Sequence, residues 1–467
     1  MIALSLAEVA AAVGGHLIVG AQATEATIVS GTVTTDSREV VAGGVFVAKR
    51  GESDDGHRFV ASAVQAGASL VIGERDSGVS VPQIIVADSV AALGALATDV
   101  VRRVRERGAL RVIGITGSNG KTTTKNLVRT ILERQAPTVA ARKSFNNEVG
   151  APTTMLELTY DTQYLVAEMG ASAVGEISSL VRMACPDIGV VLKVGLAHAG
   201  EFGGIEQTIR AKSEMVTDLA GSAVAVLNVD DPNVAAMAEL TRARVVRFGL
   251  SPEADVWASD IEVGRRGTTF TLHSAGERAS VVFGVLGEHH VMNALAAAAV
   301  ARECGVPLAE IASALESVTL AERWRMQLLP VRDDITLIND AYNASPDSMS
   351  AALKTLAQVR GEGRSIAVLG EMTELGELAG DEHDRIGLQV VRLGISQLVV
   401  VGAGARRMHI TAINEGSWDG ESVYFEHQAD ALAYLERTTR PGDTILVKSS
   451  NSAGLRVLGD QLGELLS

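Results

Sequence analysis

A glycine-rich loop between an apolar run and a helical pattern constrains the fold more than any other feature. Residues 111–116 predict a strand, and apolar residues at helical spacing predict a helix over residues 122–135. The loop between them reads Gly117-Ser-Asn-Gly-Lys-Thr122. Glycines let backbone N–H groups approach phosphate oxygens, and the start of the following helix attracts negative charge. The segment therefore predicts a phosphate-binding loop in an α/β fold.

The loop departs from the standard eight-residue pattern, because Ile115 stands where the first glycine belongs. A glycine-rich turn before an ordinary helix is the alternative interpretation. In a nucleotide-binding loop, Lys121 would neutralise charge on the transferred phosphoryl group and the Thr122 hydroxyl would bind Mg²⁺. The residues expected to contact the nucleotide here are Thr116, Gly117, Ser118, Asn119, Gly120, Lys121 and Thr122.

The length of 467 residues requires more than one hydrophobic core, since single cores stop growing at about 250–300 residues. Gly108 follows a helical stretch rich in arginine, and a new strand pattern begins shortly after it. We expect three domains in series, over residues 1–108, 109–324 and 325–467. The class is α/β, with a doubly wound parallel sheet around the phosphate loop in the central domain and a Rossmann-like C-terminal domain.

Strand and helix patterns alternate along the second and third domains, which is typical of parallel sheets. In the first domain, strands are predicted at 28–34, 44–49, 69–72 and 83–86, with helices near 57–66 and 91–107. Central strands are predicted at 164–167, 188–194 and 223–228, and helices at 205–219 and 290–304. Residues 245–285 are interpreted as a β-rich insertion. The last domain has predicted strands at 336–339, 365–369, 397–401 and 444–447.

Composition excludes several functional classes. The net charge of −15 argues against sequence-independent nucleic-acid binding, which requires basic patches. No stretch approaches the length of a membrane span, and the first residues lack the basic start of a signal peptide. Only Cys185 and Cys304 occur, so we expect a protein of a reducing compartment, the cytoplasm. Nothing in the pattern requires an obligate interface, and a monomer is expected.

Two polar residues follow predicted strands of the central domain. Glu168 ends the run 164–167, where α/β folds of this kind place a metal-orienting acid. His198 follows the strand 188–194. An ordinary loop carboxylate and a structural histidine remain the alternatives for these two positions.

Motifs over nearly the whole chain, in the same order, resemble the Mur ligases, which build the peptide stem of peptidoglycan. They are Thr116-Gly-Ser-Asn-Gly-Lys-Thr122, Glu168-Met-Gly170, His198, Ala211-Lys-Ser-Glu214, His290-Val-Met-Asn293 and Asp340-Ala-Tyr-Asn343. Three further stretches resemble the family member that adds D-Ala-D-Ala: Asn146-Asn-Glu-Val-Gly-Ala-Pro152, Asp340-Ala-Tyr-Asn-Ala-Ser-Pro346 and Gly370-Glu-Met-Thr-Glu-Leu-Gly376. The motifs of the enzyme that adds the third stem residue are not found.

The resemblance implies ATP and Mg²⁺, two ions being expected, as cofactors. It implies that Thr122, Glu168, His198 and a carbamylated Lys212 bind metal, and that Lys121, His198 and Lys212 are catalytic. A carbamate is an anionic oxygen ligand, whereas a protonated lysine repels Mg²⁺. The nucleotide contacts implied outside the loop are Asn293, Arg325, Asp340, Tyr342 and Asn343.

The resemblance also implies UDP-N-acetylmuramoyl-tripeptide and D-Ala-D-Ala as substrates, joined through an acyl phosphate. Its substrate-contacting residues are Ser37, Arg38, Asp55, His57, Asn146 and Asn147. The run 446–451 departs from the family's Lys-Gly-Ser-Arg, and only Lys448 is kept as a further candidate. Another ligase of the superfamily, such as the third-residue enzyme or a folylpolyglutamate synthetase, and a non-catalytic nucleotide-binding module stay open as alternatives.

Overall fold

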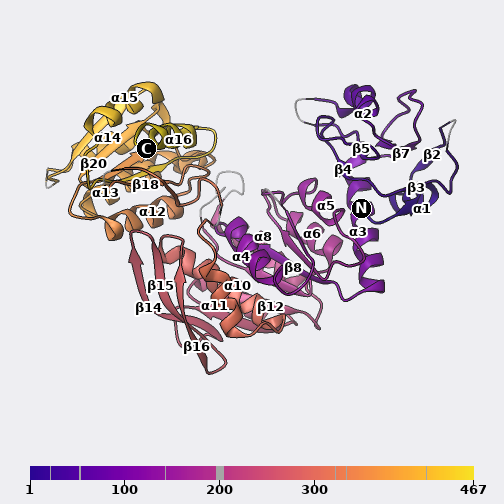
Figure 1. Cartoon of the computed structure of the whole chain (residues 1–467), viewed down its shortest axis with the longest axis horizontal. Coiled ribbons are helices and arrows are strands. Elements are labelled where there is room, and N and C mark those ends of the chain that lie inside the picture. Colours follow the sequence, from indigo (N-terminus) through magenta and orange to yellow (C-terminus); the bar gives the residue numbers. More distant parts are fainter. Residues whose placement is uncertain are drawn as a thin grey trace.

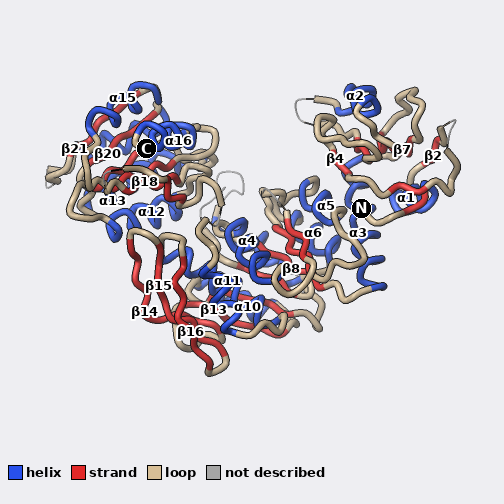
Figure 2. Tube along the Cα trace, in the orientation of Figure 1, coloured by secondary structure: helices blue, strands red, loops and turns tan. Residues whose placement is uncertain are grey.

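Three lobes, each built around its own sheet, make up the described chain (Figure 1). The computed structural model describes residues 1–20, 23–51, 54–141, 144–195, 204–320, 322–332, 334–416 and 418–467. The N-terminal and C-terminal lobes lie at opposite ends in Figure 1, and the central lobe lies between them. Helices cover both faces of the central and C-terminal sheets, as in doubly wound folds (Figure 2). The predicted α/β class is confirmed.

The N-terminal lobe holds a five-stranded sheet in the order β2-β7-β6-β5-β4, in which β2 alone is antiparallel. Its elements are β1 (Leu4–Ser5), α1 (Leu6–Val13), β2 (His16–Ile18), β3 (Ile28–Val29), β4 (Val33–Thr34), β5 (Val45–Val47), η1 (Gly56–Phe59), α2 (Val60–Gln65), β6 (Leu70–Gly73), β7 (Gln83–Ile85) and α3 (Ser89–Arg107). The prediction of one strand over 28–34 was wrong. β3 pairs with β1 and β4 with β5, because Gly31 between them lies against the backbone of Gly43, where a Cβ atom would meet the carbonyl oxygen at 2.0 Å.

The central lobe contains a nine-stranded sheet in the order β16-β15-β14-β13-β12-β11-β8-β10-β9. Neighbours from β9 to β14 are parallel, and β14, β15 and β16 are antiparallel. Its strands are β8 (Arg111–Thr116), β9 (Thr138–Ala140), β10 (Tyr164–Glu168), β11 (Ile188–Val191), β12 (Val224–Asn228), β13 (Arg244–Gly249), β14 (Val256–Gly264), β15 (Gly267–Ser274) and β16 (Glu277–Phe283). The predicted β-rich character of residues 245–285 is confirmed, but the segment is not an insertion apart from the sheet, since β13 pairs with β12 and β14, β15 and β16 follow in turn.

Helices pack on this sheet through buried apolar faces. They are α4 (Lys121–Leu132), α5 (Gly150–Met155), α6 (Glu176–Ala184), α8 (Ile205–Thr217), α9 (Pro232–Ala235), η2 (Ala236–Leu240), α10 (Glu288–Glu303) and α11 (Leu308–Glu316). The alanine run of α10 is fully buried, and its small side chains let α10 approach α4 closely. No described helix has the length and apolar character needed to cross a membrane.

The C-terminal lobe has a six-stranded sheet in the order β17-β18-β22-β19-β20-β21, parallel except for β17. Its elements are β17 (Gln327–Leu329), β18 (Thr336–Asn339), α12 (Pro346–Val359), β19 (Ser365–Leu369), η3 (Gly376–Leu378), α13 (Ala379–Arg392), β20 (Gln397–Val401), η4 (Ala403–Ala405), α14 (Arg406–Ile413), β21 (Glu421–Phe425), α15 (Gln428–Thr438), β22 (Thr444–Lys448) and α16 (Leu455–Leu465). The four predicted strands of this lobe are confirmed, which bears out the Rossmann-like unit.

The N-terminal lobe shares more buried apolar residues with the central lobe than the C-terminal lobe does. One cluster of buried residues runs from Leu6 of α1 through Leu93 of α3 to Leu165 of β10, so the N-terminal and central lobes share a core. The C-terminal lobe builds two clusters of its own, and Leu286 of the central lobe enters one of them. The C-terminal lobe is therefore attached through fewer apolar contacts.

Candidate active site

The phosphate loop joins β8 to α4, as predicted. Gly117 and Gly120 have φ angles of 148° and 88°, which glycine adopts most easily. A Cβ atom on Gly120 would lie 2.3 Å from the Asn293 side-chain oxygen, so the loop and α10 are in direct contact. Lys121 Nζ donates to the Gly117 carbonyl oxygen at 2.7 Å, and the lysine is thereby folded back over its own loop.

A buried acidic centre lies beside the loop. Glu168 ends β10, which pairs with β8, so strand pairing brings it next to the loop. The Thr122 hydroxyl lies 3.1 and 3.2 Å from the two Glu168 carboxylate oxygens, and 2.9 Å from the Ser144 hydroxyl. Asn146 Nδ2 donates to Glu168 Oε1 at 3.0 Å, and Lys125 Nζ lies 3.9 Å from Glu168 Oε2. The centre thus combines closely spaced hydroxyl and carboxylate oxygens with the nearby ammonium group of Lys125.

Three lysines near this centre have lowered pKa values. Burial lowers the pKa of Lys121, and the nearby Arg325 lowers it further, while Glu168 opposes both. Burial likewise lowers the pKa of Lys125. The pKa of Lys212 on α8 falls to about 7 through burial and then through the charge of Lys121. A lysine with such a pKa is partly neutral near pH 7, and a neutral amine is the form that reacts with CO₂.

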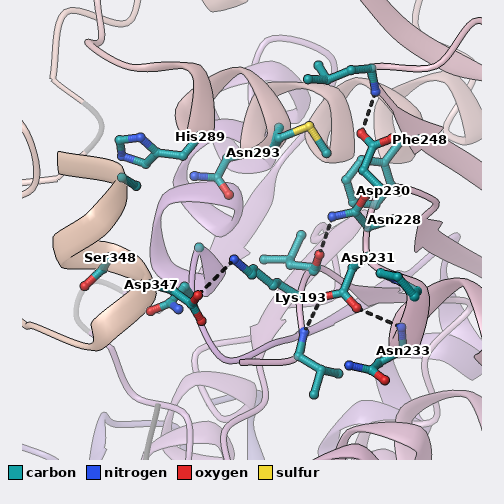
Figure 3. Close-up of a pocket in the computed structure, with 18 residues that line it drawn as sticks. Lys193, Asn228, Asp230, Asp231, Asn233, Phe248, His289, Asn293, Asp347 and Ser348 are labelled. Carbon is teal, nitrogen blue, oxygen red and sulfur yellow. Dashed lines mark hydrogen bonds and ion pairs between the residues drawn. The ribbon is translucent and has the colours of Figure 1, made fainter. Parts of the chain in front are cut away.

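A cavity of about 560 Å³ opens next to the loop, between α10, α12 and the ends of β11 and β12. Figure 3 shows Asn293 and His289 of α10 on one side and Asn228 and Asp231 on another. Burial lowers the pKa of His289 to about 4, so this histidine is neutral near pH 7. The cavity has the size and the polar-lined, partly apolar character of a small-molecule site.

Two polar contacts join the C-terminal lobe to the edge of this cavity. Lys193 pairs with Asp347 of α12, with Nζ and Oδ1 3.5 Å apart (Figure 3). The Ser345 hydroxyl at the start of α12 donates to the Asn119 side-chain oxygen at 3.2 Å. The start of α12 therefore docks directly on the phosphate loop.

The C-terminal lobe also presents a buried ion pair. Lys448 Nζ lies 2.6 Å from Asp340 Oδ2, and both side chains are at most 10% exposed. Asp340 Oδ1 accepts from the backbone N–H of Met326 at 3.0 Å. The guanidinium of Arg325 stacks over the Tyr342 ring at 4.6 Å. A smaller cavity of about 70 Å³ reaches Gly120 and Asn293 of the central lobe. On the side of the C-terminal lobe it is lined by Arg325, Asp340, Asn343 and Lys448.

Some of the buried polar atoms without a described partner lie at or next to the phosphate loop and at the start of the C-terminal lobe. These are Asn119 Nδ2, Arg325 Nε and the Thr116 hydroxyl, whereas those of Arg105, Gln397 and Thr444 lie elsewhere. Buried donors are almost always satisfied in a folded protein, so such a group needs a ligand or water. Two N–H donors between the loop and the C-terminal lobe fit the oxygens of a nucleotide's phosphates.

The predicted residues of the N-terminal lobe lie apart from this site. His57 is bonded at both ring nitrogens: Nε2 accepts from the backbone N–H of Glu74 at 2.8 Å, so Nδ1 donates to Asp55 Oδ1 at 2.6 Å. The Asp55 carboxylate holds a lowered pKa through its hydrogen bonds to His57 and also contacts Arg75. Arg38 pairs with Asp36 on the surface, and Ser37 lies between them. Substrate contacts by these residues stay predictions.

Asn146, Asn147 and His198 are the predicted residues that remain to be placed. Asn146 lies in the acidic centre, whereas the Asn147 side-chain oxygen accepts from the backbone N–H of Gly150, the first residue of α5, at 2.9 Å. His198 lies outside the described residues. Within the described ranges, no group of three or more His, Cys, Asp or Glu side chains could hold a metal ion by itself.

Sequence reasoning missed several residues of the site. Lys125 follows Lys121 by four positions, the spacing that places two side chains on one face of a helix, and could have been found that way. His289 precedes a quoted motif by one residue. The Ser144 contact and the Lys193–Asp347 pair bring together distant parts of the chain, and no local pattern indicates them.

Comparison with known proteins gives the family. A family model described as the Mur ligase middle domain matches residues 115–301. A model for the Mur ligase glutamate ligase domain matches 324–451, and one for the Mur ligase catalytic domain matches 31–115. The UDP-N-acetylmuramoyl-tripeptide–D-alanyl-D-alanine ligase of Mycobacterium tuberculosis is 45% identical over an alignment of 502 positions, gaps included, that covers 99% of this chain and 98% of the relative.

Solved structures agree over the full length. MurF from Acinetobacter baumannii aligns with a TM-score of 0.89 and 32% identity, covering 99% of both chains. MurF from Thermotoga maritima in complex with ADP aligns with a TM-score of 0.82 and 26% identity, covering 94% of this chain and 98% of that one. Three matched domains and full-length likeness leave one assignment: this chain belongs to the Mur ligase family.

Proposed function

We propose that this enzyme is an ATP-dependent ligase that joins D-Ala-D-Ala to UDP-N-acetylmuramoyl-tripeptide, releasing ADP and phosphate. The observation that carries the proposal is the contact between the Thr122 hydroxyl and the buried Glu168 carboxylate, at the start of the helix that follows the phosphate loop. Relatives that carry this ligase name match nearly the whole chain, among them the enzyme of Mycobacterium tuberculosis.

The residues present fit ATP with Mg²⁺. The orphaned donors Asn119 Nδ2 and Arg325 Nε belong to residues that line the small cavity beside the phosphate loop, and the adjoining 560 Å³ cavity has room for a nucleoside. Closely spaced hydroxyl and carboxylate oxygens suit a hard divalent cation. Thr122, Glu168, His198 and a carbamylated Lys212 are the proposed ligands for two ions. A bound cation there would neutralise charge on the phosphoryl oxygens.

The chemistry follows from the poor reactivity of a carboxylate toward an amine. Transfer of the γ-phosphoryl group of ATP to the tripeptide carboxylate makes an acyl phosphate, whose carbonyl carbon the neutral amine of D-Ala-D-Ala then attacks. Loss of phosphate from the tetrahedral intermediate leaves the amide. Lys121 and the loop N–H groups would stabilise the charge that gathers on the phosphoryl oxygens. Asn293, Asp340, Tyr342 and Asn343 would position the nucleotide.

Carbamylation of Lys212 is part of the proposal. The side chain is only 2% exposed and belongs to the same buried region as Lys121. An anionic carbamate would complete the oxygen ligands that Thr122 and Glu168 begin. ¹³C-NMR of enzyme equilibrated with ¹³CO₂ tests this, because a carbamate carbon signal present in the parent enzyme should be absent from Lys212→Met.

Substrate binding is assigned to the three domains over residues 1–108, 109–324 and 325–467. The first would hold the UDP part through Ser37, Arg38, Asp55 and His57, the second ATP, and the third the incoming dipeptide. The contacts of Ser345 and Asp347 with the central lobe support a C-terminal lobe that closes on ATP and shields the acyl phosphate from water. We place this enzyme in the cytoplasm as a monomer.

One experiment decides between this function and its alternatives. The purified chain, UDP-tripeptide, ATP and a panel of amines are incubated, and ADP release and product mass are measured. ADP release that depends on D-Ala-D-Ala, with a product heavier by the dipeptide less water, is expected. Release with a single amino acid such as a diamino acid or glutamate would instead indicate another ligase of the superfamily, and nucleotide binding without amine-dependent ADP release would indicate a binding module.

A further inference from the structure

The antiparallel hairpin of β14 and β15 reaches beyond the rest of the central sheet. Its strands pair from Val256 with Ser274 to Gly264 with Gly267, which leaves Arg265 and Arg266 as the tip. Figure 1 shows the hairpin extending from the central lobe to the C-terminal lobe beneath α12. A paired hairpin is stiffer than a single connecting segment, so its tip can hold a neighbouring lobe in place.

Arg265 makes the polar contacts of this tip. Its Nε and Nη2 atoms donate to the Thr336 hydroxyl at 3.1 and 2.8 Å, and Nη2 also donates to the carbonyl oxygen of Asp334. The guanidinium lies beside Gly361, where a Cβ atom would come within 3.4 Å of Nη1. Arg266, the other tip residue, is exposed. The two arginines therefore differ in contact although they are neighbours in the chain.

Apolar packing supports the same junction. Val263, just before the tip, packs against the buried cluster of the C-terminal lobe, and Leu286 belongs to that cluster. Beyond such contacts this lobe builds its own core, in contrast to the shared core of the other two lobes. The contacts at the hairpin thus help to orient the C-terminal lobe, together with the contacts at the start of α12.

Thr336, the residue that Arg265 contacts, lies on the strand that leads to the candidate active site. Thr336 is the first residue of β18, and Asp340 follows the last. A strand of this length spans about 13 Å, at about 3.3 Å per residue. β18 is hydrogen-bonded to β22, which ends at Lys448, the ion-pair partner of Asp340. A displacement at Thr336 is therefore passed along the sheet to the Asp340–Lys448 pair.

We propose that Arg265 is a positioning residue for the ligase reaction. By anchoring the start of β18 to the central sheet, its guanidinium sets how Asp340 and Lys448 face the phosphate loop. Arg265 itself lines neither of the two cavities beside the phosphate loop. This inference rests on the proposed function, because its effect is measured as amide-forming turnover.

The test compares Arg265→Ala with Arg266→Ala as the matched control. Arg265→Ala should lower kcat for D-Ala-D-Ala-dependent ADP release about tenfold, since small misplacements of reacting groups are costly. Its Kd for ADP should change less than kcat, because the phosphate loop and Asn293, which belong to the central lobe, stay in place while Asp340 is displaced. Arg266→Ala should match the parent enzyme in both measurements. Arg265→Lys should recover part of kcat, as one of the donors is restored.

Thr336→Val completes a double-mutant cycle, because it removes the oxygen that accepts both hydrogen bonds. The losses in Arg265→Ala and Thr336→Val should be less than additive when the two are combined. Equal kcat values for Arg265→Ala and Arg266→Ala, or full additivity with Thr336→Val, would overturn the inference. Absence of turnover in the parent enzyme would instead refute the proposed function, so the two failures are distinguishable.

Discussion

Replacing Gly120 by alanine tests the contact between the phosphate loop and α10. The new Cβ atom would lie 2.3 Å from Asn293 Oδ1, so the amide must move by roughly 1 Å to reach ordinary contact distance. The movement breaks the hydrogen bond from the Thr124 hydroxyl to Asn293 Oδ1, which is 3.4 Å long. Asn293 is proposed to hold the nucleotide, and loss of one hydrogen bond between them costs about 1 kcal/mol, equivalent to about a fivefold weaker ADP affinity.

The backbone cost of the same substitution needs a separate control. Gly120 has a φ of 88°, and alanine in this region costs about 1–2 kcal/mol wherever it stands. Gly276, in the turn between β15 and β16, has a φ of 79°, and a Cβ atom added there would meet nothing within 4 Å. Gly276→Ala should therefore lower thermal stability by a similar backbone cost without changing ADP affinity.

Isothermal titration calorimetry measures the Kd for ADP of Gly120→Ala and Gly276→Ala. The same measurement is made on each variant combined with Asn293→Ala. Gly120→Ala should weaken binding in the parent background and add little once Asn293 is gone, because the displaced group is then absent. The reasoning is refuted if Gly120→Ala binds ADP as tightly as Gly276→Ala. It is equally refuted if the loss persists in full in the Asn293→Ala background.

Two further predictions concern buried charge. Lys448→Met leaves the Asp340 carboxylate buried without its partner and should destabilise the C-terminal lobe by about 3–5 kcal/mol, while adding Asp340→Asn should recover most of the loss in thermal unfolding. Burial and the nearby His289 hold the pKa of His290 well below its ordinary value. Below about pH 6.5, this histidine therefore becomes protonated in the unfolded chain but stays neutral in the folded chain. His289, whose pKa is lowered to about 4, adds to the effect. The free energy of unfolding should then fall by up to about 1.4 kcal/mol per pH unit for each of these two histidines below about pH 6.5, with His290→Gln reducing the slope and the exposed His16→Gln leaving it unchanged in denaturant titrations at pH 7 and 5.

The sequence predicted best those elements whose local pattern and tertiary role agree. The strand 111–116 and the strand 336–339 were placed correctly to the residue, because continuous apolar runs in buried parallel strands are bounded by polar turns. The run 28–34 failed because a close backbone approach at Gly31 divides it, and that approach depends on a residue distant in the chain. Likewise, the pairing of residues 245–285 with the central sheet depends on β13 lying next to β12.

Within the site, individual residues were easier to predict than their partners. Glu168 was found from its position after a strand, and the structure places it against Thr122. Asp340 was predicted to contact the nucleotide, yet both of its carboxylate oxygens are engaged by Met326 and Lys448. These two contacts depend on how Met326 and Lys448 of β22 pack against Asp340, and a sequence motif does not encode that packing.

The hydrogen bond from Ser345 to Asn119 has a thermodynamic consequence. It joins the loop proposed for ATP to the lobe proposed for D-Ala-D-Ala, so the occupancy of one can alter the free energy of the other. Any such coupling is reciprocal: the factor by which ATP changes the dipeptide's Kd must equal the factor by which the dipeptide changes that of ATP. With such a coupling, a compound that occupied only the dipeptide region would bind with a different affinity depending on whether the phosphate loop holds a nucleotide.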